Sequence, residues 1–75
     1  MRDKIIEILN DIKPGVDYEH ETSLIDSHIY DSLSIISLVS ELSFEFNVDI
    51  DVMDLIPDNL NSVNAIIELI HELQA

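Results

Sequence analysis

The chain has 75 residues, a length that accommodates one domain over residues 1–75 and leaves no room for a second hydrophobic core. Apolar residues make up 47% of it, which excludes typical disorder, and the absence of cysteine excludes disulfides and fits a reducing compartment. The formal net charge is −13 and no Lys or Arg follows Lys13, so the surface repels nucleic-acid phosphates and anionic lipids and attracts basic protein surfaces.

The first segment with helical periodicity covers residues 3–13. The Pro14-Gly15 pair ends this predicted helix. Residues 14–31 then form a connection without a sustained period. Because this is long for a loop, we expect its apolar side chains to pin it to the domain, or the loop to serve function. The apolar face of the first helix consists of Ile5, Ile8, Leu9 and Ile12, at the i, i+3, i+4, i+7 spacing.

The second predicted helix runs from Ser32 to Phe46. Asp31 is its expected N-cap, because a short acidic side chain can accept a hydrogen bond from the first turn. Asn47 is the expected left-handed terminator. The apolar face of this helix consists of Ile35, Leu38, Val39, Leu42 and Phe46, with Leu33, Ile36 and Phe44 widening or flanking it.

The C-terminal part of the chain contains two further predicted helices. Residues 48–51 alternate like a strand but have no partner, so we interpret them as an extended connector. A short helix is predicted over residues 52–56, ending before Pro57, and the last helix begins with Asn61 or Ser62 as its N-cap. The predicted fold is all-α, a small bundle of three main helices plus a short helix before the last. The residues expected in the core rather than at a ligand site include Phe44, Phe46 and Met53.

Ser32 is the residue that most strongly suggests chemistry, because it occupies the first turn of the longest predicted helix. Unpaired backbone N–H groups and the positive end of the helix dipole converge there. Since the same groups bind free phosphate, they would stabilise a phosphate ester on this hydroxyl. An Asp-Ser pair is also an ordinary helix start, and Asp26-Ser27 is a second such pair. The second pair precedes no helical stripe, so we favour Ser32.

Several stretches carry a resemblance to a known family. Residues 24–27 (LIDS) and 31–36 (DSLSII) are similar to a loop followed by an Asp-Ser-Leu motif and an apolar helix. Residues 41–50 contain a Glu-Phe pair followed by an Ile/Val couple, and residues 60–66 are similar to the entry into a final helix. Over nearly its whole length the chain resembles the acyl and peptidyl carrier proteins, which carry thioester-bound cargo on a 4′-phosphopantetheine arm.

The resemblance implies a stand-alone carrier that is not itself an enzyme. Ser32 would carry the 4′-phosphopantetheine, Asp31 would be read by the transferase that attaches it, and Leu33 would contact partner enzymes. The implied partners are a phosphopantetheinyl transferase, an acyl- or aminoacyl-activating ligase and downstream transferases, and the carrier itself is expected to be a monomer. The acidic residues implied in docking basic enzyme surfaces are Glu41, Glu45, Asp51 and Asp54.

The sequence departs from the family pattern in two places. The loop at residues 27–30 has no glycine, so we expect backbone dihedrals that suit L-residues, and we expect Tyr30 to bring bulk close to the arm. The second helix contains only Glu41 and Glu45 as acidic residues, with serines elsewhere. This pattern favours carriers that are paired with a dedicated ligase, of the aminoacyl, D-alanyl or specialised acyl types, over the fatty-acid type.

Other interpretations fit the residues less well. The three histidines are not spaced one helical turn apart and no cysteine accompanies them, so no metal site is predicted. A serine hydrolase would lack the Gly-x-Ser-x-Gly elbow. An acidic helical adaptor without a prosthetic group remains the alternative function. No run approaches the ~20 apolar residues of a membrane span and no signal peptide is evident, so we expect a cytoplasmic protein without membrane insertion.

Overall fold

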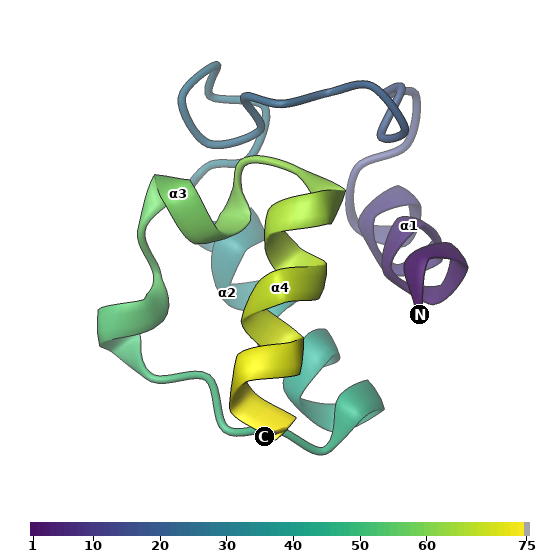
Figure 1. Ribbon diagram of the computed structural model, residues 1–75. Helices are drawn as coiled ribbons and strands as arrows, with labels where there is room; N and C mark the ends of the chain where they lie inside the picture. The colour runs from purple at the N-terminus through teal and green to yellow at the C-terminus, as the bar shows by residue number, and fades with distance from the viewer. Residues whose placement is uncertain (75) are drawn as a thin grey trace.

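The structure is a computed structural model that describes residues 1–74, and within that range its regular secondary structure is helical, with no strand. Figure 1 shows the long 14–31 connection crossing one end of the bundle between the first two helices. None of the helices in residues 1–74 combines the length and the apolar character that crossing a membrane requires. The elements are α1 (Arg2–Ile12), α2 (Ser32–Phe46), the 3₁₀ turn η1 (Val52–Asp54), α3 (Pro57–Leu60) and α4 (Val63–Gln74).

The core is built from the apolar faces of the helices together with residues of the long connection. Helix α1 packs against both α2 and α4, and α3 packs against α4. From the connection, Tyr18, Leu24 and Tyr30 are each at most 2% exposed and belong to the same buried cluster as the helix residues. The expectation that apolar side chains pin this segment is therefore confirmed.

Helices α1 and α2 run antiparallel, and this places the end of α1 beside the start of α2. At one end of the pair, the Lys4 ammonium lies 3.7 Å from the Glu45 carboxylate. At the other end, Lys13 follows α1 and lies close enough to Asp31 for its charge to contribute to lowering the pKa of that carboxyl. The residues around Ser32 are thus supported by α1 as well as by their own helix.

The segment between α2 and α4 differs in part from the sequence prediction. The helix predicted over residues 52–56 is the shorter 3₁₀ turn η1, Val52–Asp54. The additional helix α3, Pro57–Leu60, is absent from the prediction, which treats Pro57 only as a stop signal. Proline also suits the first position of a helix, where its fixed φ is already helical and its missing N–H has no intrahelical acceptor.

The prediction that Phe44 and Met53 are core residues is wrong. Their side chains are 88% and 82% exposed, respectively, whereas Phe46 is half-buried. Phe44 follows the fully buried Leu42 by two residues, which is about 200° around the helix, so its side chain points away from the core. Hydrophobicity alone was a poor guide at these two positions.

Candidate functional site

Ser32 lies at the first helical position of α2, with Asp31 as the N-cap. The Asp31 carboxylate accepts a hydrogen bond from the backbone N–H of Ser34 at 2.9 Å, and its carbonyl accepts one from the N–H of Ile35 at 2.9 Å. The hydrogen bond from the Ser34 backbone is the main cause that lowers the pKa of Asp31, with a smaller contribution from the charge of Lys13. The predicted N-cap is confirmed, and it fixes where the helix begins.

The surroundings of the Ser32 side chain fit a phosphate ester. Ser32 is exposed, and its backbone N–H makes no hydrogen bond within residues 1–74. The next residue, Leu33, is 77% exposed, so no packed side chain closes over the hydroxyl from that position. A phosphoryl group on Oγ would lie at the positive end of a fifteen-residue helix, where free N–H groups and the dipole stabilise negative charge.

Tyr30 anchors the chain immediately before this site. Its phenol hydroxyl donates a hydrogen bond to the carbonyl of Leu9 at 2.8 Å, and its backbone N–H donates to the carbonyl of Leu24 at 3.0 Å. Burial is the main cause that raises the pKa of Tyr30 far above its usual range. The expectation that Tyr30 brings bulk close to an arm on Ser32 is wrong, because the side chain points into the core and is 2% exposed.

Asn61, at the end of α3, holds the preceding part of the loop. Its side-chain oxygen accepts hydrogen bonds from the N–H groups of Ile25 at 2.9 Å and Asp26 at 3.1 Å. Its side-chain nitrogen donates to the Asp26 carboxylate at 3.0 Å. Ser27 is the competing serine, and the Asp26 carboxylate before it is already bonded to Asn61. Ser27 itself lies in a turn, and its N–H donates a hydrogen bond to the carbonyl of Ser23. It has no helix dipole to stabilise an anion.

His28 has the left-handed backbone conformation that glycine adopts most readily, with φ at 60°. The expectation that this glycine-free loop uses only dihedrals suited to L-residues is wrong. Histidine is among the residue types that tolerate this region better than most, but it still costs free energy relative to glycine. The hydrogen bonds of Tyr30 and Asn61 on either side hold the turn in place.

The predicted docking residues of α2 spread around the helix from its exposed side to its α1 side. Leu33 is exposed beside Ser32, and Ile36, expected to widen or flank the apolar face, is also 59% exposed. Glu41 and Glu45 instead face α1, where Glu45 pairs with Lys4. A helical wheel centred on the fully buried Leu38 and Leu42 would have placed Ile36 on the outer side, since it lies about 200° from Leu38.

Asp51 and Asp54 cap the turn η1. The Asp51 carboxylate accepts from the N–H of Met53 at 3.1 Å, and the Asp54 carboxylate accepts from the N–H of Asp51 at 3.2 Å. These reciprocal bonds form a capping box, which gives both residues a local structural role. Asp51 is exposed and Asp54 is half-buried, so the first remains open to a partner.

Comparison with protein families identifies one family that matches this sequence. The family described as the phosphopantetheine attachment site matches residues 2–70, which include all of α1, α2 and α3 and most of α4. The chain belongs to this family. Its members bind a 4′-phosphopantetheine prosthetic group and are carriers that do not themselves catalyse a reaction. No curated protein and no solved structure matches the chain significantly.

Proposed function

We propose that this phosphopantetheine-family protein carries acyl or aminoacyl groups as thioesters on an arm attached to Ser32 and presents them to partner enzymes. The arm supplies, when bound, the thiol that a chain without cysteine lacks. The chain's own residues position the attachment point and provide the surface that enzymes recognise.

The position of Ser32 is the observation that carries the proposal. It is exposed at the first turn of α2, its N–H is free of hydrogen bonds within the described residues, and it lies inside the part of the chain matched by the family. Its alternative, Ser27, is also exposed but precedes no helix. Only Ser32 therefore combines accessibility with electrostatic stabilisation of a phosphodiester.

The residues around Ser32 have distinct proposed roles. Asp31 is the acid that the phosphopantetheinyl transferase recognises, and its low pKa keeps it ionised at neutral pH. Leu33 contacts the partner enzymes, and the exposed Ile36 extends this apolar surface along α2. The acidic residues proposed to dock the basic surfaces of enzymes are Glu41, Glu45, Asp51 and Asp54.

The proposed cargo is one activated by a dedicated ligase. The outer side of α2 carries Leu33, Ile36 and serines rather than acids, which supports a partner set different from that of the fatty-acid type. We further propose that the protein acts as a cytoplasmic monomer, loaded by an acyl- or aminoacyl-activating ligase and unloaded by downstream transferases.

Intact mass after incubation with coenzyme A, magnesium and a permissive phosphopantetheinyl transferase tests the proposal. We expect the wild-type chain to gain one phosphopantetheine, Ser32→Ala to gain none, and the matched control Ser27→Ala to behave as the wild type. Retained modification in Ser32→Ala would overturn the assignment. No gain in the wild type with two unrelated transferases would favour an adaptor without a prosthetic group.

A further inference from the structure

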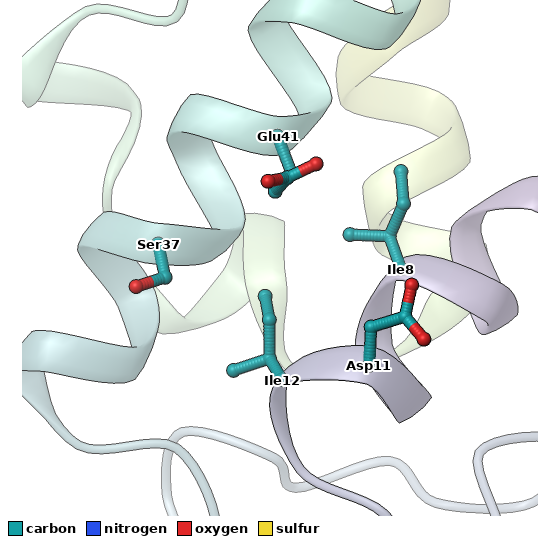
Figure 2. A pocket seen from close by; sticks show the side chains of 5 residues that line it. All are labelled: Ile8, Asp11, Ile12, Ser37 and Glu41. Atoms are coloured by element: carbon teal, nitrogen blue, oxygen red, sulfur yellow. The ribbon is translucent and has the colours of Figure 1, made fainter.

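A hollow of about 280 Å³ lies between α1 and α2 and is lined by residues of these two helices. Its wall on the α1 side is apolar, and carboxylates from both helices flank that wall, as Figure 2 shows. The hollow is slightly below the about 300–1,000 Å³ of typical small-molecule sites, and it is open to solvent. The lining residues are Ile8, Asp11, Ile12, Ser37 and Glu41.

Among residues 1–74, no charged side chain pairs with either carboxylate of the hollow. The salt bridges within residues 1–74 use Arg2, Lys4 and His20, and none involves Asp11 or Glu41. Neither side chain takes part in a hydrogen bond within those residues, and both are exposed. Because the protein has a net charge of −13, an occupant that brings positive charge is favoured over a neutral or anionic one.

The hollow adjoins the surface beside the attachment site. Leu33, Ser37 and Glu41 follow one another at i, i+4 and i+8, so they form a single row along α2. The first residue of this row is the exposed side chain beside Ser32, and the other two line the hollow. An enzyme that covers Leu33 while acting on Ser32 or its arm would therefore also lie over the hollow.

We propose that the α1–α2 hollow receives an arginine side chain of the enzyme that docks over Leu33. The aliphatic part of that arginine would lie on Ile8 and Ile12, and its guanidinium would lie between the Asp11 and Glu41 carboxylates. Arginine fits better than lysine, because its planar group has five donors and can serve two acceptors at once. Its apolar stem also covers hydrophobic surface while the charge stays near water.

This inference rests on the proposed function, since the docking surface is the one around Ser32, and it adds α1 to that surface. It gives Asp11 a role that its position in the first helix did not suggest. It also separates Glu41, which lines the hollow, from Glu45, which is already paired with Lys4.

The test is a titration of the wild-type chain with N-acetyl-arginine amide, followed by NMR of the isoleucine methyl groups and backbone amides. The neutral isostere N-acetyl-citrulline amide is the matched probe. We expect saturable shifts at Ile8, Ile12, Ser37 and Glu41 with the arginine probe and none with citrulline. Asp11→Asn and Glu41→Gln should each weaken binding about two- to fivefold, as for exposed charge pairs, and the exposed Glu72→Gln on α4 should not.

Three results would overturn the inference. The first is an absence of shifts at Ile8 and Ile12 with the arginine probe, and the second is equal shifts with both probes. The third is binding of the arginine probe by Asp11→Asn and Glu41→Gln that is as tight as binding by the wild type. A carrier whose amine-bearing cargo shifts these signals while the arginine probe does not would show that the hollow serves cargo instead. Modification of Ser32, measured by mass on the same samples, keeps the two proposals apart: if Ser32 is modified and the arginine probe does not bind, only the hollow is misassigned.

Discussion

Replacing Tyr30 with phenylalanine tests how the fold holds the segment that leads into Ser32. The substitution removes one hydroxyl from a side chain that is 2% exposed and keeps the ring, so it opens no cavity of the size of a side chain. The main hydrogen bond lost is the one from the Tyr30 hydroxyl to the Leu9 carbonyl, 2.8 Å long, which joins the loop to α1 across 21 residues of sequence. The long 3.4 Å contact that the Tyr30 hydroxyl accepts from the Tyr18 hydroxyl is lost with it.

The expected cost follows from what remains bonded. The Leu9 carbonyl keeps the backbone N–H of Lys13 at 2.9 Å, and the Tyr18 hydroxyl keeps the Lys13 carbonyl at 2.5 Å. No buried group is left without a partner, so the loss should be that of one net hydrogen bond, about 1 kcal/mol. For a domain of this size that corresponds to a fall in Tm of about 4–8 °C.

Urea unfolding followed by circular dichroism measures this cost, and its pH dependence gives a second readout. Burial raises the pKa of Tyr30 above its unfolded value, so its contribution is complete below about pH 10 and is lost as the pH rises beyond that. Tyr30→Phe should therefore lose less stability in alkali than the wild type. Burial also raises the pKa of Tyr18, so the Tyr30→Phe variant should still lose some stability in alkali. An unchanged unfolding free energy, or a loss above about 3 kcal/mol, would refute this account of the bond.

Three further substitutions test the rest of the support. His28→Gly should be more stable than His28→Ala by about 0.5–1 kcal/mol in urea unfolding, because φ is 60° there, and the opposite order would contradict that conformation. Asn61→Ala should cost about 2 kcal/mol by the same assay, since it removes three hydrogen bonds to Ile25 and Asp26. An unchanged unfolding free energy would contradict the role of Asn61 in holding the loop. Asp31→Ala should lower Tm by removing the N-cap, whereas Asp31→Asn should keep the cap. The Ser34 N–H lowers the pKa of Asp31, so the ionised Asp31 side chain stabilises the fold above about pH 4. This stabilisation is lost as the pH falls through the pKa of Asp31 in the folded protein. Asp31→Asn should lack that loss of stability in acid.

The bounds of α2 could be predicted from the sequence because local chemistry specifies both ends. Asp31 supplies the N-cap, and Asn47 takes the left-handed conformation with φ at 53°. The apolar period of the same helix also identified Leu38 and Leu42, which are fully buried. Signals of this kind involve residues close together in the chain, and they hold whatever the rest of the fold does.

The features that were missed depend on contacts between distant segments. Nothing near Tyr30 indicates that its hydroxyl reaches Leu9, or that Asn61 bonds the loop 35 and 36 residues before it. The hollow likewise needs Asp11 and Glu41 from two helices, which only the antiparallel packing of α1 and α2 brings together. Such pairings follow from the tertiary arrangement and leave no periodic trace in the sequence.

Localising the prosthetic group on the chain tests the central claim most directly. Cleavage before aspartate separates the competing serines, because Ser27 falls in residues 26–30 and Ser32 falls in residues 31–48. After treatment with coenzyme A and a phosphopantetheinyl transferase, tandem mass spectrometry should find the added phosphopantetheine in residues 31–48, on Ser32. Its presence in residues 26–30, or on a later serine of α2, would contradict the account of a carrier whose arm is attached at the start of this helix.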